Sequence, residues 1–397
     1  MKLILILFVL FNYANSQQIV GIGMGPSYQY DIYYSFDSGI TAYPERNNWH
    51  LAFSTDLSSG NIRINSGAPV SLYEVGQSFD SWSQIESLNQ NAVQLRNSNT
   101  DWNIGAFVSN SSGSSDFGWG NYNESNGLIE GNKIYVIDSP VGQKKIRINS
   151  FFTGLFDFTI SNLDGSSEET ILLDVSQYQD KRFIYFSLEN NQVIDREPPK
   201  EEWDLLFTRY EENLYPNQSD PFYYYVSGVK SNGNLTYQFD APDDVDPILD
   251  ISNFISDINT IGYDWKEYSG SFVIVPNRSY FIFNQNENIL YKIIFESFSG
   301  QSTGNLEFSI EEIEYNFSYL DENIDDVMIY PNPNSGNFNI SVNNEFFSAF
   351  IYDLNGQIVS AYDCEGVCNI DLNNSKGIYI LKIESNNINI IKKIIVD

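Results

Sequence analysis

The sequence WHLAF at residues 49–53 returns as WDLLF at residues 203–207. Apolar residues alternate in both segments with the two-residue period of a β-strand, so we expect Trp49, Leu51 and Phe53 to share one face. The same expectation applies to Trp203 and the residues that follow it. A motif that returns in this way indicates a repeated structural unit.

Further matches occur in the same order on either side of the two motifs. The sequence YSFD at 34–37 precedes the first motif, and FSLE at 186–189 precedes the second. An Asp-Trp pair and three strand-like runs then follow in each copy, at residues 101–102, 133–137, 145–151 and 155–160 and at residues 264–265, 279–283, 292–298 and 306–310. We therefore predict a duplicated module, with copy one at residues 17–165 and copy two at residues 166–320.

Residue preferences predict strands almost throughout the chain. Thr, Ile, Tyr and Phe fill the apolar runs, and Gly, Asn, Asp and Ser separate them, as in antiparallel sheets. Residues 246–261 could hold one short helix, with Pro247 in its first turn. The predicted fold class is all-β, with two tandem antiparallel β modules produced by internal duplication and a small C-terminal β-sandwich.

Residues 321–397 predict a small β module of their own. Phe338, Ile340 and Val342 alternate with polar residues. Asn-Gly at 355–356 lies between two apolar runs, which is the strongest local signal for a tight hairpin. These features alone define structure and carry no chemistry.

The order of motifs in this C-terminal segment resembles a known family. YPNPNSG at 330–336, the hairpin at 351–359, GIYILKI at 377–383 and KKIIV at 392–396 are arranged as in the type A C-terminal sorting domain of Bacteroidetes type IX secretion cargo. The resemblance covers residues 326–397. It implies that the type IX secretion machinery is a partner of this chain.

Residues 1–16 have the pattern of a signal peptide. Lys2 precedes an apolar run at 3–11, and small residues at 14–16 come before Gln17. That run is too short to cross a hydrocarbon core as a helix, which takes ~20 residues. We predict a chain without a transmembrane segment that is exported through the inner membrane and then secreted or attached to the outer cell surface.

The composition favours folded, acidic domains. Hydrophobic residues make up 42% and aromatic residues 15% of the chain, which is enough to bury real cores. The formal net charge is −31, from 52 acidic and 21 basic residues. Such a surface repels nucleic acid and anionic lipid, so nucleic-acid binding is excluded.

Cysteine and histidine are scarce, which limits the chemistry. The two cysteines, Cys364 and Cys368, lie close together in the C-terminal segment, and in an exported protein they predict a disulfide bond. His50 is the only histidine, so a metal site with two histidines is excluded. A serine–histidine–carboxylate triad would have to use His50, and no signature supports one.

The repeat itself also resembles a family, the HmuY-like domain of Bacteroidetes. The matching motifs are GMGP at 23–26, YYS at 33–35, WHLAF at 49–53 and IRINSG at 62–67 in copy one, and WDLLF at 203–207 and YVSGV at 225–229 in copy two. The resemblance implies an all-β fold and extracellular haem binding through a histidine pair or a methionine pair. With one histidine, and with Met24 and Met328 as the methionines after the first residue, this chain departs from both patterns.

Four aromatic residues are candidate ligand contacts, namely Trp102, Trp119, Tyr122 and Trp265. The loop DFGWGNY at 116–122 combines flat apolar rings with amide groups, as a glycan or small planar ligand requires. The alternative is an aromatic loop packed on the sheet. His50 is a further candidate, but Asp204 takes its place in copy two, which favours a polar position at the surface or a hydrogen bond between paired strands.

Metal binding has its candidates among the acidic clusters of the chain. Asp243, Asp244 and Asp246 form an acidic cluster that could bind calcium, although it lacks the spacing of a helix–loop–helix site, and a solvated loop is the alternative. No cofactor is predicted, with haem and calcium as the alternatives.

The function predicted from these features is a non-enzymatic binding or adhesion protein, exported by type IX secretion and secreted or held at the cell surface. Duplication favours binding, because two equivalent sites raise avidity. One alternative is a haem or tetrapyrrole scavenger with non-standard ligation. The other is an extracellular glycan hydrolase, which would need a pair of carboxylates that the spacing does not single out.

Overall fold

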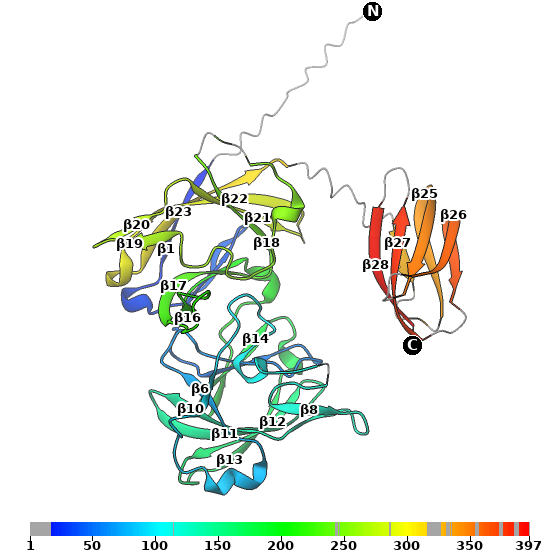
Figure 1. Ribbon diagram of the computed structural model, residues 1–397. Coiled ribbons are helices and arrows are strands. Elements are labelled where there is room, and N and C mark those ends of the chain that lie inside the picture. Colours follow the sequence, from blue (N-terminus) through cyan, green and yellow to red (C-terminus); the bar gives the residue numbers. More distant parts are fainter. Residues whose placement is uncertain are drawn as a thin grey trace, which may run out of the picture. The chain divides into compact units, whose positions relative to one another are not determined.

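The computed structural model describes residues 17–113, 115–242, 245, 247–285, 287–315, 327–330, 334, 336–353, 357–372, 376–384 and 389–396 (Figure 1). The chain divides into two compact units. The first, called the body, is residues 1–247 and 254–314, and the second, called the tail unit, is residues 315–397 with 248–253. The described elements are strands and short 3-10 turns, so the predicted all-β class is confirmed. The predicted signal peptide at residues 1–16 lies outside the described residues.

The largest sheet of the body has eight antiparallel strands. They are β6 (Ser71–Gly76), β7 (Val93–Leu95), β8 (Gly120–Asn123), β9 (Leu128–Gly131), β10 (Ile134–Ser139), β11 (Gly142–Phe152), β12 (Leu155–Asn162) and β13 (Glu169–Asp174). Six run in the order β13-β12-β11-β10-β6-β7, and the hairpin of β8 and β9 joins at β11.

A second large sheet repeats this arrangement with five strands. They are β1 (Gln18–Gly23), β18 (Leu235–Asp240), β21 (Arg278–Asn284), β22 (Ile289–Phe298) and β23 (Asn305–Ile313), in the order β1-β23-β22-β21-β18. The pairing of β11 with β12 shifts register between Ile148 and Ser150, and the pairing of β22 with β23 shifts between Phe295 and Ser297. A β-bulge at the equivalent place in both sheets supports the internal duplication.

Two four-stranded sheets complete the body. One contains β4 (Leu51–Ser54), β5 (Ile62–Ile64), β14 (Phe183–Ser187) and β15 (Gln192–Ile194), in the order β15-β14-β4-β5. The other contains β2 (Ile32–Ser35), β3 (Gly39–Ala42), β16 (Leu205–Asn213) and β17 (Tyr223–Ser231), in the order β17-β16-β2-β3. These two are called the small sheets.

The two copies exchange their first strands. Strand β1 of copy one pairs with β23 at the end of copy two, and β13 of copy two pairs with β12 of copy one. The blue strand β1 accordingly lies beside the yellow strands of the other copy (Figure 1). In the small sheets, β2 pairs with β16 and β14 pairs with β4. Each half of the body therefore contains strands from both copies.

The exchanged pairings use equivalent registers. Tyr34 lies opposite Leu205, and Phe186 lies opposite Leu51. The boundary between residues 165 and 166 divides the two copies of the repeat in the sequence, and it stays a prediction. These four sheets do not follow this boundary, because each combines strands from before and after it.

Each half has its own hydrophobic core. Leu51 and Phe53 lie in one core with Phe158 and Ile184, and Leu205 and Phe207 lie in the other with Ile32 and Phe308. A third cluster joins the small sheets and is called the interface cluster. Its buried members are Tyr33, Ala52, Trp102, Phe183, Tyr185, Trp203, Leu206 and Ile258.

The two motif tryptophans belong to this interface cluster, which corrects one expectation. Trp49 and Trp203 do not share a face with the next alternating residues, because β4 begins at Leu51 and β16 begins at Leu205. Strict alternation starts only inside the strand. Trp49 instead packs edge-on against Tyr185 at 4.8 Å, and Trp203 packs in the equivalent way against Tyr33 at 5.1 Å.

Some described elements outside these four sheets are short. Strands β19 (Lys266–Tyr268) and β20 (Phe272–Ile274) form a separate hairpin. In the stretch where a short helix was considered, residues 246–261, the described helical element is one 3-10 turn at Ile251–Asn253. Among the described residues, no helix has the length and apolar character needed to cross a membrane.

The tail unit is a five-stranded antiparallel sheet. Its strands are β24 (Val327–Tyr330), β25 (Asn337–Tyr352), β26 (Ile358–Asp371), β27 (Gly377–Glu384) and β28 (Asn389–Val396). Phe338, Ile340 and Val342 are buried in its core, as their alternation predicts. Strands β25 and β26 form the predicted hairpin around residues 353–357.

Candidate binding site

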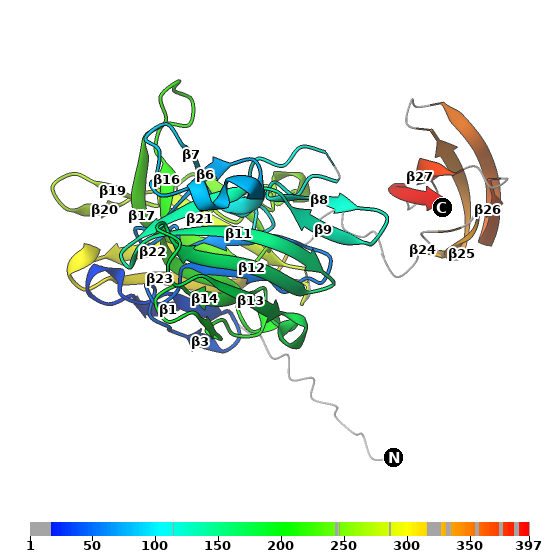
Figure 2. The same cartoon turned by 90° about the horizontal axis from the view of Figure 1, so that it is seen from below.

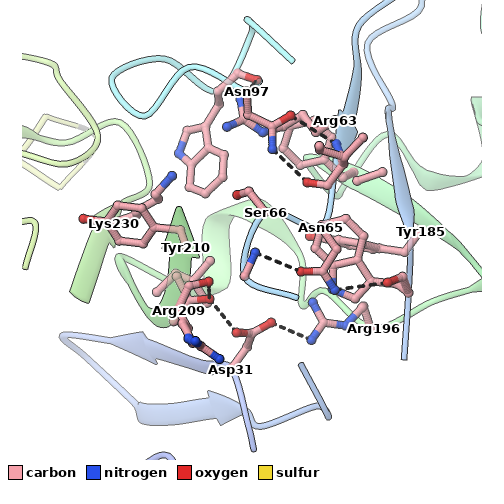
Figure 3. Close-up of a pocket in the computed structure, with 18 of the residues that line it drawn as sticks. Asp31, Arg63, Asn65, Ser66, Asn97, Tyr185, Arg196, Arg209, Tyr210 and Lys230 are labelled. Carbon is pink, nitrogen blue, oxygen red and sulfur yellow. Dashed lines mark hydrogen bonds and ion pairs between the residues drawn. The ribbon is translucent and has the colours of Figure 1, made fainter. Parts of the chain in front are cut away.

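A cavity of about 60 Å³ lies between the small sheets, where the two halves of the body meet (Figure 3). That volume is room for about two water molecules or one small anionic group. Half-buried residues Ser66, Asn97 and Arg209 bring the lining to the surface of the body. The lining contains four basic side chains, Arg63, Arg196, Arg209 and Lys230, and one acidic one, Asp31.

Two of the basic residues occupy equivalent places in the repeat. Arg63 on β5 lies opposite Ala52 of β4, and Lys230 on β17 lies opposite Leu206 of β16. Their neighbours along the strands turn into the two cores, so alternation directs Arg63 and Lys230 into the interface. The strands around Arg63 and Lys230 are thus buried on both faces, and each small sheet directs one residue of this equivalent pair at the cavity.

Backbone carbonyl groups hold Arg63 in place. Its Nη1 donates to the carbonyl oxygens of Asp101 and Trp102 at 2.9 and 3.0 Å, and its Nη2 donates to that of Ser98 at 2.6 Å. The side chain is 4% exposed. Burial lowers the pKa of Arg63 to about 10, so the guanidinium remains charged at neutral pH without a carboxylate bonded to it.

Lys230 is also buried without a carboxylate bonded to it. Its Nζ donates to Asn99 Oδ1 at 2.9 Å and lies 4.4 Å from the centre of the Tyr210 ring. Burial lowers the pKa of Lys230 well below its usual value, and the positive charge of Arg63 lowers it further. An anion in the cavity would oppose both effects.

The acidic residue of the lining is already engaged. Asp31 accepts hydrogen bonds from Arg196 Nη2 at 2.8 Å and from Thr208 Oγ1 at 2.6 Å (Figure 3). Within the described residues, Arg196 Nε and the Tyr210 hydroxyl are buried without a hydrogen-bond partner. Buried donors of this kind are costly unless something accepts from them, and both belong to residues that line the cavity.

Equivalent tyrosines meet beside these charges. The hydroxyl groups of Tyr33 and Tyr185 lie 3.3 Å apart, and Tyr185 donates to Glu197 Oε2 at 2.6 Å. Burial raises the pKa of the Glu197 carboxyl, although the hydrogen bonds from Tyr185 and from the Arg182 backbone favour its charged form. The pair marks the point where the two copies face each other.

The predicted aromatic contacts are dispersed. Trp102 lines the cavity and donates from Nε1 to the Ser231 carbonyl at 2.9 Å. Trp119 is fully buried and bonded to the Gly60 carbonyl, and Trp265 stacks in the other core on Phe295 at 4.0 Å. Neither buried indole leaves a face for a ligand. Tyr122 is 44% exposed, on β8.

His50 makes a hydrogen bond between the two copies. Its Nδ1 accepts a hydrogen bond from the Leu188 backbone at 3.1 Å, and Asp204 accepts one from the Phe36 backbone at 2.8 Å. The two residues therefore hold equivalent segments of the opposite copies, in line with the strand hydrogen bond considered for His50. Burial lowers the pKa of His50, so the neutral ring is favoured, with its proton on Nε2 because Nδ1 is an acceptor.

The other predicted site residues can be placed briefly. Asp243, Asp244 and Asp246 lie outside the described residues. In the part of the chain that is described, no group of three or more His, Cys, Asp or Glu side chains is arranged to hold a metal ion. A disulfide bond joins Cys364 to Cys368 in the tail unit.

Sequence reasoning missed the cations of the cavity. A signal was present, because Arg63 stands between Ile62 and Ile64 in a strand buried on both faces, and Lys230 follows Val229 at the equivalent place. A charged residue inside such a run is rare unless it is paired or has a role.

The fold and the site define an all-β protein with an interlocked body, a cationic cavity and a separate tail unit. Residues 328–397 match the family described as the secretion system C-terminal sorting domain. The predicted type IX sorting domain is therefore confirmed. It implies that the chain is a substrate recognised by the type IX machinery and is carried to the cell surface or secreted.

No curated protein matches the chain. One solved structure with similarity is PorZ of Porphyromonas gingivalis, described as an essential bacterial surface component of the type-IX secretion system. The identity is 11% and the TM-score 0.17, over 69% of this chain and 44% of that one. This chain thus spans less than half the length of PorZ, and a similarity this low carries no argument about function.

Proposed function

We propose that the protein is a non-enzymatic binding protein, secreted or displayed at the cell surface, which holds an anionic group of its ligand in the cavity between the small sheets. The observation that carries the proposal is the pair of equivalent buried cations, Arg63 and Lys230, neither of them bonded to a carboxylate. In a chain of net charge −31, this concentration of positive charge is a local exception. The sorting domain supplies the route of export.

The lining favours binding over glycan hydrolysis. Hydrolysis usually takes two carboxylates that face the scissile bond, whereas the lining contributes Asp31 alone, and Arg196 and Thr208 occupy both of its oxygens. The haem alternative is not favoured by His50, which is buried and holds the Leu188 backbone. A carboxylate or a phosphate has the charge and the size that the cavity accepts.

The proposal can be tested by titrating the full chain with acetate and with inorganic phosphate at constant ionic strength. We expect one of them to raise the melting temperature and to change tryptophan fluorescence, because Trp102 lies beside both cations. A ligand at 100 times its Kd stabilises the folded state by about 2.7 kcal/mol. Binding should strengthen as the pH falls, since a bound anion favours protonated Lys230.

Lys230→Met keeps a side chain of similar length and removes the charge, so it should abolish the response. Lys292→Met, which removes a lysine paired with Glu311 at 3.7 Å on another sheet, is the matched control and should respond like the wild type. A wild-type chain that responds to neither anion, or a Lys230→Met chain that responds equally, would contradict the proposal.

A further inference from the structure

The hairpin formed by β16 and β17 carries an exposed row of aromatic rings. Tyr215, Phe222 and Tyr224 are 49%, 50% and 57% exposed. The ring centres of Tyr215 and Phe222 are 5.9 Å apart with planes inclined by 32°, and those of Phe222 and Tyr224 are 6.3 Å apart and inclined by 19°. The three residues are called the aromatic strip. The hairpin extends away from the rest of the body in green (Figure 2).

The two faces of this hairpin differ. Tyr223 and Tyr225 alternate with the strip and point the other way, where Arg96 lies 3.7 Å from the Tyr223 ring centre and Arg209 lies 4.6 Å from that of Tyr225. Each guanidinium group lies over one ring, and Tyr223 is 36% exposed. Phe222 and Tyr224, in contrast, contact each other and leave about half of their surface to solvent.

The loop between the strands is held in place by a side chain. Asn213 Oδ1 accepts hydrogen bonds from the backbone N–H groups of Tyr215 and Phe222, both at 3.1 Å. The Leu214 backbone also donates to the Phe222 carbonyl at 2.9 Å. The backbone at two residues of the strip is thereby held in place before any ligand arrives, which lowers the entropy cost of ordering the loop on binding.

We propose that the aromatic strip is a binding site for a neutral polysaccharide. The face of a sugar ring is apolar and packs on a flat aromatic ring, while its hydroxyl groups need polar partners at the rim. Exposed Asn217, Gln218 and Asp220 in the same loop supply such partners. Three rings in succession with small inclinations suit a chain of sugars better than a single compact ligand.

The charge around the strip favours a neutral polysaccharide over the other kinds of ligand that bind exposed aromatic residues. Glu212 and Asp220 lie in the hairpin and its loop, Glu211 is paired with Arg96 at 2.9 Å, and the whole chain is strongly acidic. Such surroundings repel anionic lipid surfaces and acidic polymers. A neutral glycan is not repelled by these charges, so it is the ligand that suits the strip.

The test is affinity electrophoresis of the purified full chain through native gels that contain hydroxyethyl cellulose, galactomannan or xylan. We expect at least one of these polysaccharides to retard the wild-type chain. The double variant Phe222→Ser/Tyr224→Ser should bind that polysaccharide at least about tenfold more weakly. Tyr43→Ser is the matched control, because Tyr43 is 68% exposed elsewhere in the body, and it should migrate like the wild type.

Several results would overturn the proposal. One is that none of the three polysaccharides changes the migration of the wild-type chain, and another is that wild type and double variant are retarded equally. The proposal would also fail if phosphatidylglycerol vesicles captured the wild type but not the double variant, or if the wild type were a dimer and the double variant a monomer. The variant side chains are exposed, so unchanged urea unfolding shows that a loss of binding is local. Lys230→Met should keep the retardation, which separates this site from the cavity.

Discussion

Buried basic residues recur in the body, and their partners include carbonyl groups, a carboxylate and aromatic rings. Arg63 donates to carbonyl groups, Arg196 pairs with Asp31, and Lys266 lies over a ring. Lys266 Nζ donates to the Ser227 carbonyl at 2.7 Å and lies 3.9 Å from the centre of the Trp265 ring. Burial lowers the pKa of Lys266 to about 7, which makes it a measurable contributor to the pH dependence of stability.

The direction of this pH dependence follows from the protonation of Lys266 in the folded and the unfolded chain. Between pH 7 and the unfolded pKa of about 10.4, the unfolded chain holds the proton on this lysine and the folded chain does not. The free energy of unfolding therefore rises with pH through this window. Below it both states are protonated, and the full cost of the buried charge remains.

We predict that Lys266→Met flattens this rise. The wild-type free energy of unfolding, relative to the variant, should increase by up to about 1.4 kcal/mol per pH unit between pH 7 and 10. Urea unfolding at pH 7, 8 and 9 measures the difference, with Lys292→Met as the control for loss of a surface lysine. Parallel curves for wild type and Lys266→Met would show that the folded lysine keeps its proton throughout.

At the scale of elements, strand exchange places the first residues of copy one in the core of the other half. Ile22 on β1 is 2% exposed and lies opposite Leu306 of β23. Ile19 on the same strand lies opposite Ser309 and is 58% exposed. Strand β1 thus offers one buried and one exposed isoleucine whose substitutions can be compared.

We predict that Ile22→Ala lowers the free energy of unfolding by ~2–5 kcal/mol, since it removes buried methyl groups and leaves a cavity. Ile19→Ala should change it by about 0.5 kcal/mol or less. Urea unfolding followed by tryptophan fluorescence reports on the body, because its residues include all six tryptophans. Equal effects of the two substitutions would mean that β1 is not packed on the core in solution.

At the scale of the whole molecule, the exchange makes the two halves of the body inseparable. Cutting the chain between the copies leaves each half with strands from both fragments. The exposed turn at residues 164–168 lies between β12 and β13 and can accept a cleavage site.

We predict that a chain cleaved at a protease site inserted in this turn elutes as one species in size-exclusion chromatography without denaturant. The fragments should separate only in urea, because separation exposes the interface cluster and the edges of four sheets. An uncut chain with the same insertion is the control. Fragments that part under native conditions would show that the halves are made of single copies.

The sequence predicted a good part of this structure. The strand runs at 133–137, 145–151 and 155–160 became β10, β11 and β12, and the alternation of Phe338, Ile340 and Val342 became the core of the tail unit. The aromatic candidates differ in exposure, because exposure depends on what covers a ring: Trp119 is fully buried, whereas Tyr122 is 44% exposed.

The sequence by itself determined the all-β class, the duplication and the sorting domain, because these depend on local periodicity and on motif order. The tertiary structure alone decided the strand exchange and the cavity. The strand at Ile32–Ser35 and the strand at Phe183–Ser187 present the same apolar pattern, so either could pair with either tryptophan motif. Only the packed body selects the crossed pairing, and with it the interface into which Arg63 and Lys230 are directed.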